Sequence, residues 1–406
     1  MRSEPKSIVI LGAGQAGAWA AKTLRDEGYA ANLFLVSEEQ HAPYERPALS
    51  KQVLSGQAEL GSTRVFRSEI LEGLKLQGRS GVRAASVDRP QRLVTLADGT
   101  QLPYDKLLFC TGGRAHRPDI PGVYQEGVFT LRTIDDCRNI ASALAQAGRV
   151  CVIGGGWIGL EVASTAAGMG KEVVLLERGD TLCRRLLPDS LGDYLLALHR
   201  AAGIEVHLGA TAQSIERAPT GLRVVTSAGA AIEADLVVIG AGLVPNDELA
   251  AHAGLHCARG IVVDSQCVTS DPDILAAGDV AVAPNSWAGG LVRLESWQNA
   301  TEQAVAAAKN CLGAKVQYDP LPWFWSDQHG TNLQIYGWPQ PSHRVVTRQL
   351  AAPGSFLTFL LEGERVASAV AVNAPKELRA SRKLIQQRAT VRDVDLAQPQ
   401  IALASL

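Results

Sequence analysis

Ile8-Val9-Ile10-Leu11-Gly12-Ala13-Gly14-Gln15-Ala16-Gly17 is the stretch that decides how the chain folds. A short apolar run ends here in a glycine turn, and an alanine-rich helical pattern follows from Ala18 to Arg25. Strand, turn and helix in this order are the context in which a G-x-G-x-x-G loop binds a dinucleotide. Gly12 permits the tight turn, Gly14 lets the backbone approach a pyrophosphate, and Gly17 lets the helix pack on the strand. A single copy is weak evidence, because such a loop can be purely structural.

A second copy of the loop follows later in the chain, in Ile153-Gly154-Gly155-Gly156-Trp157-Ile158-Gly159. It also follows an apolar run and precedes a helical pattern, which extends to Ala167. The first turn of each helix offers unpaired N–H groups to bound phosphates. Two complete copies therefore predict two dinucleotide sites in one chain.

An acidic side chain follows the next strand after each loop. Glu38 has this place after the first loop, and Glu177 has it after the second. A carboxylate at this place accepts hydrogen bonds from ribose hydroxyls and repels a 2′-phosphate, so Glu177 favours NAD over NADP. The alternative for Glu38 is a solvated strand end. Three basic residues weaken the preference for NAD, namely Arg178, Arg184 and Arg185.

The composition excludes several classes of protein. The chain has 406 residues, 46% hydrophobic and 20% charged, as in globular proteins of two or three domains. A net charge of −2 gives no electrostatic basis for nucleic-acid binding. No apolar run approaches the roughly 18 residues that cross a bilayer, and residues 1–6 leave no room for a signal peptide before the first strand. We therefore expect no nucleic-acid or membrane partner.

The seven cysteines are scattered, and none forms a C-x-x-C pair. An odd number without disulfide or metal spacing predicts buried free thiols, no metal site and a reducing, cytoplasmic location.

The remaining segments alternate between strand and helix patterns. Pro43 to Lys51 reads as a rigid extended segment, and a helix is expected to begin near Ser50. The other expected elements are a strand pair in 82–96 with a turn at 88–90, strands within 104–110, 234–240 and 274–277, and a helix in 295–309.

From Tyr318 the pattern changes to an aromatic cluster, Trp323-Phe324-Trp325, followed by strand-like segments and an amphipathic helix from Lys376 to about Gln387. Strands followed by a helix predict a separate α+β domain. Residues 376–392 carry six basic residues and one acidic residue. This basic surface is either an ordinary solvated helix face or a docking face for an acidic protein.

Four motifs make the chain similar to a known family. Together with both glycine loops and the Gly278-Asp279 turn, they resemble the ferredoxin reductases of bacterial oxygenase systems, within the flavoprotein disulfide-reductase superfamily. These are the putidaredoxin-reductase type and the reductases of Rieske ring-hydroxylating dioxygenases. Ala48 stands where many relatives have proline, and Trp157 where some have tyrosine. The motifs are Pro47-Ala48-Leu49-Ser50-Lys51, Gly154-Gly155-Gly156-Trp157-Ile158-Gly159-Leu160-Glu161, Val292-Arg293-Leu294-Glu295-Ser296-Trp297 and Pro322-Trp323-Phe324-Trp325-Ser326-Asp327-Gln328.

The resemblance implies an α/β fold with two Rossmann-like dinucleotide-binding domains and a C-terminal α+β domain. The FAD-binding domain would span 1–109 and 236–316, the NAD-binding domain 110–235, and the C-terminal domain 317–406. Disulfide reductases carry a redox cysteine pair on the segment occupied here by residues 48–51, which contains no cysteine. Electrons are therefore expected to leave the flavin directly, without a thiol relay.

The resemblance also assigns residues to two cofactors, FAD and NADH. Lys51 paired with Glu161 would stabilise the negative charge of the reduced flavin, and Trp325 would lie at the ferredoxin-facing edge of the flavin. These three are the expected catalytic residues. The expected FAD residues are Gly12, Gly14, Ala16, Gly17, Glu38, Lys51, Ala84, Arg132, Asp279 and Trp297. The expected NADH residues are Gly154, Gly156, Trp157, Ile158, Gly159, Glu177 and Gly242.

In the family that the chain resembles, NADH reduces FAD, which passes single electrons to a [2Fe–2S] ferredoxin. We expect a Rieske-type ferredoxin of an aromatic ring-hydroxylating dioxygenase as the partner, and the chain as a monomer or weak homodimer. The alternatives are a reductase for a P450 ferredoxin or rubredoxin, and an NADH-sensing regulatory flavoprotein. Core packing is the alternative role for the tryptophans. The expected docking residues are Trp323, Trp325, Arg379, Arg382 and Lys383.

Overall fold

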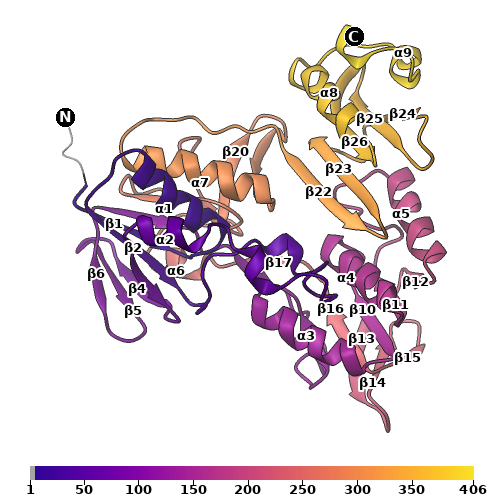
Figure 1. The fold of residues 1–406 in the computed structure, drawn as a ribbon, viewed down its shortest axis with the longest axis horizontal. Helices are drawn as coiled ribbons and strands as arrows, with labels where there is room; N and C mark the ends of the chain where they lie inside the picture. The colour runs from indigo at the N-terminus through magenta and orange to yellow at the C-terminus, as the bar shows by residue number, and fades with distance from the viewer. Residues whose placement is uncertain (1–4) are drawn as a thin grey trace. The chain divides into compact units, whose positions relative to one another are not determined.

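A computed structural model of the protein describes residues 5–406. Residues 1–4 lie outside the described residues. They belong to the segment 1–6, from which we expected no signal peptide. The chain forms two compact units (Figure 1). Unit 1 comprises Met1–Glu45, Gly61–Arg114 and Val244–Pro322, and unit 2 comprises Arg46–Leu60, Ala115–Leu243 and Trp323–Leu406. The division into three domains stays a prediction.

Unit 1 is built on a parallel sheet that carries the first glycine loop. Its strand order is β19-β7-β1-β2-β3, and β1 and β7 are almost entirely buried apolar residues, as central parallel strands require. Helices α1 (Gln15–Asp26) and α7 (Trp297–Cys311) pack together in its core through alanines. The strands are β1 (Ser7–Leu11), β2 (Asn32–Ser37), β3 (Gln77–Ser80), β7 (Lys106–Phe109) and β19 (Ile274–Ala276).

Two small sheets complete unit 1. The strand pair expected in 82–96 is confirmed as the antiparallel pair β4 (Ala84–Asp88) and β5 (Leu93–Leu96), extended by β6 (Gln101–Pro103). The second sheet has the order β18-β20-β21. Its strands are β18 (Ile261–Val262), β20 (Ala281–Asn285) and β21 (Gly290–Val292), and the remaining short helices are η2 (Leu60–Thr63), α2 (Ser68–Gly73) and α6 (Glu248–His252).

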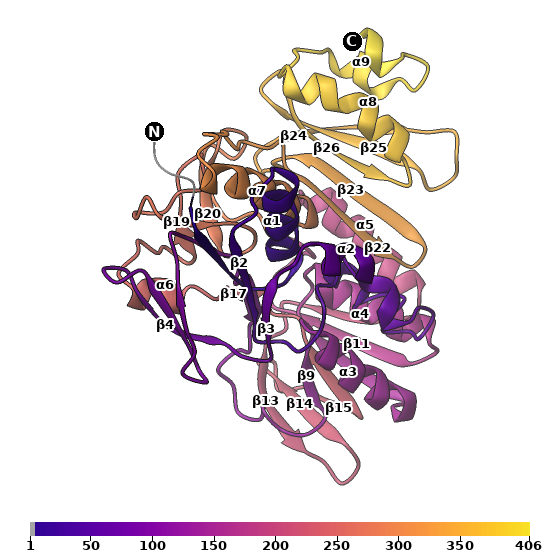
Figure 2. The same ribbon diagram turned by 60° about the vertical axis from the view of Figure 1, so that its left-hand side comes forward.

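Unit 2 contains a second parallel sheet, with the order β12-β11-β10-β16-β9. The antiparallel strands β13, β14 and β15 form a separate three-stranded sheet (Figure 2). The parallel strands are β9 (Val128–Thr130), β10 (Arg149–Ile153), β11 (Glu172–Glu177), β12 (Glu205–Leu208) and β16 (Leu236–Ile239). The helices are α3 (Ile134–Gln146), α4 (Trp157–Gly168) and α5 (Asp189–Ala201). The other strands are β13 (Ala212–Arg217), β14 (Leu222–Thr226) and β15 (Ala231–Ala234), with β8 (Gly113–Ala115) and β17 (Leu243–Pro245) where the chain passes between units.

The C-terminal region of unit 2 is an antiparallel sheet covered by α8 (Pro375–Gln386), with α9 (Asp393–Ala397) and η3 (Leu403–Ser405) after it. The expected strands and amphipathic helix are confirmed. Leu378, Leu384 and Ile385 of α8 are buried. The strand order is β22-β23-β26-β25-β24, with β22 (Trp323–Gln328), β23 (Thr331–Gly337), β24 (Arg344–Gln349), β25 (Phe356–Glu362) and β26 (Arg365–Val372).

The expectation of a helix beginning near Ser50 is wrong. The structure has a short 3-10 helix, η1 (Arg46–Ala48), followed by turns through residue 56. Other elements hold this backbone: Thr165 Oγ1 donates to Ser50 O at 2.7 Å, and Cys137 Sγ lies 3.2 Å from Leu49 O. The backbone bonds within the segment, such as Leu49 N–H to Arg46 O and Gly56 N–H to Val53 O, are mostly those of separate turns and not of a regular i→i+4 ladder. The contacts with α3 and α4 hold these turns in place, so tertiary contacts override the local pattern.

Candidate functional site

The three glycines of the first loop differ in whether the surrounding protein requires a glycine at that position. A Cβ on Gly12, whose φ is +102°, would lie 2.2 Å from Cys110 O, and a Cβ on Gly17 would lie 1.8 Å from Gly12 O. Packing within the protein therefore requires glycine at both positions. A Cβ on Gly14 would meet no atom within 4 Å, and its φ of −75° suits any residue. Nothing in the described part of unit 1 requires glycine there.

The second loop repeats this distinction. A Cβ on Gly154, at φ +116°, would lie 2.5 Å from Gly240 O, and one on Gly159 would lie 2.0 Å from Gly154 O. Gly156, with φ −87°, again faces open space. The Gly240–Gly242 turn therefore lies directly against the second loop.

The open space at Gly14 and Gly156 fits a bound pyrophosphate. Each of these glycines is the N-cap of the helix that follows, and neither α1 nor α4 has a side-chain cap. The first N–H groups of both helices are thus left without the usual serine, threonine or aspartate oxygen. A phosphate oxygen satisfies such groups and benefits from the helix dipole. A Cβ at either glycine would occupy this cradle.

The Gly278–Asp279 turn completes the surroundings of the first loop. A Cβ on Gly278 would lie 3.0 Å from Ala16 Cβ, so the turn lies against the first turn of α1. Trp297, the first residue of α7, donates from Nε1 to Glu45 Oε1 at 3.2 Å. The glycine loop and this turn therefore lie together although they are far apart in the chain, and the FAD-binding role that the resemblance implies for both stays a prediction.

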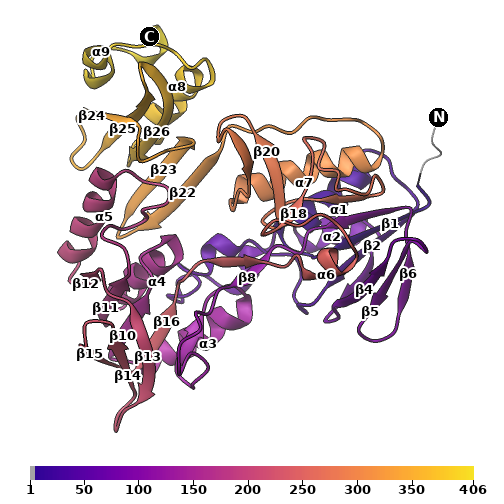
Figure 3. The same ribbon diagram turned by 180° about the vertical axis from the view of Figure 1, so that it is seen from behind.

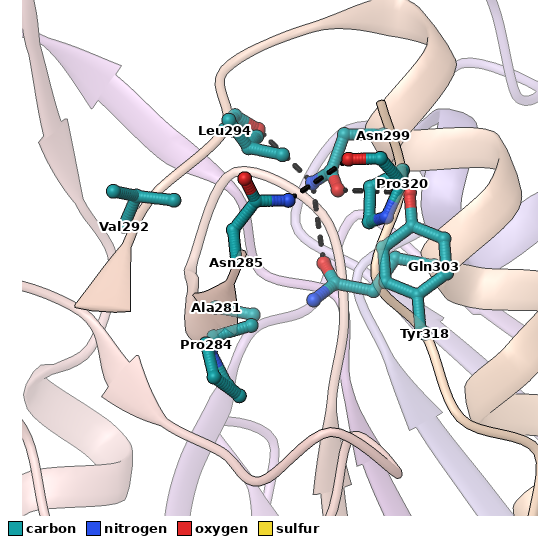
Figure 4. A pocket seen from close by; sticks show the side chains of 10 residues that line it. Ala281, Pro284, Asn285, Val292, Leu294, Asn299, Gln303, Tyr318 and Pro320 are labelled. Atoms are coloured by element: carbon teal, nitrogen blue, oxygen red, sulfur yellow. Dashed lines mark hydrogen bonds between the residues drawn. The ribbon is translucent and has the colours of Figure 1, made fainter. Parts of the chain in front are cut away.

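Buried amides hold the Gly278–Asp279 turn in place. Gly278 N–H donates to Gln303 Oε1 at 2.9 Å, and Asn299 Nδ2 donates to the same oxygen at 3.2 Å. The Tyr318 hydroxyl donates to Asn299 Oδ1 at 3.0 Å, beside a small pocket bounded by Pro320 (Figure 4). Burial raises the pKa of Tyr318, so the hydroxyl remains a neutral donor.

Glu177 is fixed beside the second loop. Its Oε2 accepts a hydrogen bond from Gly155 N–H at 2.7 Å, and its Oε1 accepts one from Gly179 N–H at 2.7 Å. Each carboxylate oxygen keeps a lone pair for a further donor. The side chain is therefore held in an orientation that can accept ribose hydroxyls.

Glu38 does not occupy the equivalent place. Gly12 N–H bonds to Val36 O, whereas Gly154 N–H bonds to Leu176 O. Ser37 therefore matches Glu177, and Glu38 lies one residue further. Its side chain is exposed and bonds to no other residue of 5–406, so it can receive a ligand; its role at the adenosine ribose stays a prediction. Ala84 begins β4 nearby, since Val82 N–H donates to Ser37 O at 3.0 Å.

Unit 2 contains the expected pairing of Lys51 with Glu161. Lys51 Nζ lies 3.0 Å from Glu161 Oε2, and only 13% and 4% of these side chains are exposed. Lys51 Nζ also donates to Pro47 O at 2.9 Å, and Ser50 Oγ donates to Glu161 Oε2 at 2.5 Å. Arg132 also lies in unit 2, where its carbonyl accepts a bond from Arg46 Nη1 at 2.5 Å. The roles of Lys51 and Arg132 toward FAD stay predictions.

Aromatic side chains occupy both faces of β22. Phe324 packs on Trp157 of α4, with ring centroids 5.0 Å apart. Trp323 and Trp325 project to the other face and stack at 5.0 Å. The ring of Tyr336 lies near Trp323. The Arg382 guanidinium lies over the Tyr336 ring, 5.8 Å from its centroid, in a cation–π contact. The structure thus places the aromatic cluster beside the basic helix, and their common role in docking stays a prediction.

The basic residues expected at a docking face lie on the outer surface of α8. Arg379, Arg382 and Lys383 are exposed, as is Lys376. No ion pair joins these four residues to another of the described residues. The helix therefore presents a positive surface next to the aromatic side chains.

Most of the cysteine side chains are buried, and burial limits their reactivity. All seven cysteines are free, and five of them are buried. Burial raises the pKa of Cys151 to about 12 and of Cys267 to about 12, which keeps these thiols protonated and unreactive. Within residues 5–406 no cluster of histidine, cysteine, aspartate or glutamate could hold a metal ion, and no helix is long and apolar enough to cross a bilayer.

Several polar residues near Glu161 were not assigned a role from the sequence. Ser50, Ser326, Gln328, His199 and His329 form a connected hydrogen-bond network with it. The two serines that bond to Glu161 lie far from it in the chain, Ser50 before it and Ser326 after it. Contacts over such distances cannot be predicted from local residue spacing. The available signals were the family motifs, which contain Ser50, Ser326 and Gln328.

Comparison with known proteins agrees with this geometry. The pyridine nucleotide-disulphide oxidoreductase family matches residues 6–304, and the reductase C-terminal family matches residues 323–406. The anthranilate 1,2-dioxygenase system ferredoxin–NAD(+) reductase component of Burkholderia cepacia is 38% identical over 99% of both chains. The 3-phenylpropionate/cinnamic acid dioxygenase ferredoxin–NAD(+) reductase component of Photorhabdus laumondii is 37% identical over 95% of this chain and 98% of that protein.

Solved structures give the same result. The ferredoxin reductase for the CYP199A2 system of Rhodopseudomonas palustris superposes with a TM-score of 0.94 at 35% identity, covering 98% of this chain and 99% of that one. The reductase in the covalent putidaredoxin reductase–putidaredoxin complex superposes with a TM-score of 0.93 at 34% identity, covering 98% and 97%. The chain therefore belongs to the pyridine nucleotide-disulphide oxidoreductases, in the branch of FAD- and NAD-binding ferredoxin reductases with a reductase C-terminal domain.

Proposed function

We propose that the chain is the reductase component of an aromatic ring-hydroxylating dioxygenase system and transfers electrons from NADH through FAD to a [2Fe–2S] ferredoxin. The observation that carries the proposal is the pair of glycine loops, each with one glycine facing open space at an uncapped helix. Relatives named as reductase components of anthranilate, p-cumate and benzene dioxygenase systems support the choice of pathway class.

The two loops have different proposed occupants. Gly12, Gly14, Ala16 and Gly17 would hold the FAD pyrophosphate, and Gly154, Gly156 and Gly159 that of NADH. Bound FAD accepts two electrons as a hydride and releases them one at a time. Glu177, already oriented by two backbone N–H groups, would accept the ribose hydroxyls of NADH. Trp157, Ile158 and Gly242 would line the same site.

The Lys51–Glu161 pair supplies the proposed electrostatic contribution. A cation in a water-poor site stabilises the negative charge of the reduced flavin more strongly than it would in water. Glu161 holds Lys51 Nζ in a fixed position at 3.0 Å. Because residues 46–60 contain no cysteine, a thiol relay at this place is chemically impossible.

The proposed ferredoxin surface comprises Trp323, Trp325, Arg379, Arg382 and Lys383. Aromatic and arginine side chains are enriched at protein interfaces, and a positive surface attracts an acidic protein over a distance set by salt. A cytoplasmic location is supported by the seven free thiols.

Steady-state turnover with purified ferredoxins tests the proposal. NADH-dependent reduction of a Rieske-type [2Fe–2S] ferredoxin should have a kcat/KM at least about tenfold above that for rubredoxin, a difference that corresponds to one lost charge-assisted contact. A protein that binds flavin and is reduced by NADH, yet turns over with no ferredoxin, would contradict it and favour a regulatory flavoprotein.

A P450 ferredoxin is the second candidate partner. The specific observation is that two solved structures, at 35% and 34% identity and with TM-scores of 0.94 and 0.93, are named for the CYP199A2 and putidaredoxin systems. Higher kcat/KM with a P450-type ferredoxin than with a Rieske-type ferredoxin would select this candidate.

A further inference from the structure

A continuous chain of hydrogen bonds connects Glu161 to two histidines that the proposed mechanism does not use. Ser326 Oγ lies 2.6 Å from Glu161 Oε1, and Gln328 Nε2 lies 2.9 Å from Ser326 Oγ. Gln328 Oε1 lies 2.8 Å from His199 Nε2, and His199 Nδ1 lies 3.2 Å from His329 Nε2. The residues come from α4, β22 with its following turn, and α5, which lie side by side (Figure 3).

The chain of hydrogen bonds is deeply buried over most of its length. The exposed fractions are 3% for Glu161, 0% for Ser326, 3% for Gln328 and 0% for His199. Water therefore cannot replace a missing donor or acceptor along it, and each polar atom depends on its neighbour. Only His329, at the end, is half-buried.

The donors of the network all point toward Glu161. An ionised carboxylate only accepts hydrogen bonds, so the Ser326 hydroxyl donates to it and must itself accept from Gln328 Nε2. The amide oxygen of Gln328 then accepts, which places a proton on His199 Nε2. Burial lowers the pKa of His199 to about 4, so the ring is neutral and Nδ1 accepts from His329 Nε2.

From this geometry we propose that His199, Gln328 and Ser326 are positioning residues that fix the orientation of the Glu161 carboxylate and so hold Lys51 against it. Glu161 receives three donors: Lys51 Nζ and Ser50 Oγ on Oε2, and Ser326 Oγ on Oε1. Gln328 Nε2 donates to one of the two lone pairs of the Ser326 oxygen and so favours the hydroxyl orientation in which the proton points to Glu161. This inference rests on the proposed role of Lys51 at the flavin.

The rate of flavin reduction by NADH, measured by stopped flow, gives the first test. His199→Leu removes the donor to Gln328 and should lower the rate constant at saturating NADH about tenfold, as expected for loss of orientation in one charge-assisted hydrogen bond. The apparent Kd for NADH should stay within about twofold, because the loop at Gly156 is untouched. His199→Gln, whose amide nitrogen can donate to Gln328, should restore most of the rate.

His343→Leu is the matched control. His343 is also partly buried, and burial lowers its pKa. Its Nδ1 accepts from Gln340 N–H, and within residues 5–406 it has no bond to the network. This variant should reduce its flavin at the parent rate.

A spectroscopic readout tests the network without any turnover. In protein labelled with ¹⁵N-histidine, the His199 signal, identified by its loss in His199→Gln, should belong to a neutral ring protonated at Nε2. Gln328→Leu should change that tautomer or speed exchange of the Nε2 proton. A ring protonated only at Nδ1 in the parent would overturn the proposal.

Lys51→Met separates the two levels of the argument. If Lys51→Met slows flavin reduction but folded His199→Leu and Gln328→Leu do not, the positioning role is wrong and the proposed function stands. If the Lys51→Met variant instead reduces its flavin at the parent rate, the proposed role of Lys51 is wrong. The positioning role of the network is then wrong too, because it depends on Lys51. Should His199→Leu fail to fold, Gln328→Leu and the NMR signal decide.

Discussion

Gly14 and Gly156 differ from the other glycines of their loops, since only at these two would an added side-chain carbon meet no protein atom within 4 Å. Gly14→Ala should therefore leave the free energy of unfolding of the apoprotein within about 0.5 kcal/mol of the parent value. The added methyl group would occupy the phosphate cradle, so the Kd for FAD should rise about tenfold or more. Chemical unfolding and flavin titration measure the two effects.

Gly156→Ala is the counterpart for the second loop. It should retain FAD and raise the KM for NADH, whereas Gly154→Ala, at φ +116° and 2.5 Å from Gly240 O, should destabilise the fold itself. Loss of FAD in Gly156→Ala, with NADH kinetics unchanged, would reverse the assignment of the two loops.

Glu177 is the residue that should select NADH. Replacing it by glutamine keeps the size but removes the negative charge that repels a 2′-phosphate. With Arg178 adjacent, the ratio of kcat/KM for NADH over NADPH should fall about tenfold in Glu177→Gln. Initial rates with both nucleotides measure this ratio. An unchanged ratio would mean that the arginines, and not Glu177, determine the preference.

At the scale of elements, the basic surface of α8 can be tested directly by reversing its charge. Reversing Arg379 and Arg382 to glutamate should raise the KM for ferredoxin about tenfold at low salt and reduce the dependence of that KM on salt. The same reversal at Arg217 and Arg223, which are far from α8 in sequence and pair with Glu126 and Glu233, is the control. A change in kcat alone would place the docking surface elsewhere.

The sequence predicted most elements because their signals are local. Both glycine loops, the strands on either side of them and helix α8 follow from periodicity and glycine spacing, and the structure confirms them. The helix predicted after Pro47 was wrong because the backbone there forms separate turns, which contacts with α3 and α4 hold in place. The network from Glu161 to His329 was missed for a related reason, since its contacts join segments that are remote in the chain.

At the scale of the whole molecule, buried histidines should make the fold sensitive to acid. The pKa of His199 is lowered to about 4 from 6.5, so between these values the unfolded chain binds a proton that the native protein does not. The contribution of neutral His199 to the free energy of unfolding should therefore be fully present above about pH 6.5. It should be lost as the pH drops toward 4, which would lower the free energy of unfolding by up to about 3 kcal/mol. His329, whose pKa burial also lowers, acts in the same direction.

Urea unfolding at pH 7, 6 and 5 measures this effect. His199→Gln should be less stable than the parent at pH 7, because the bond to His329 is lost, yet its stability should decline less between pH 7 and pH 5. Parallel pH profiles for the two proteins would mean that His199 titrates normally in the folded state.

The central claim is that electrons pass from NADH through bound flavin to a [2Fe–2S] ferredoxin without a thiol relay. Anaerobic single-turnover mixing of NADH-reduced protein with oxidised ferredoxin tests it most directly, before and after alkylation of accessible thiols. We predict that each NADH reduces two ferredoxins and that alkylation leaves the rate unchanged, since five of the seven cysteines are buried. Reduced flavin that transfers no electrons to ferredoxin, or transfer abolished by alkylation, would contradict the claim.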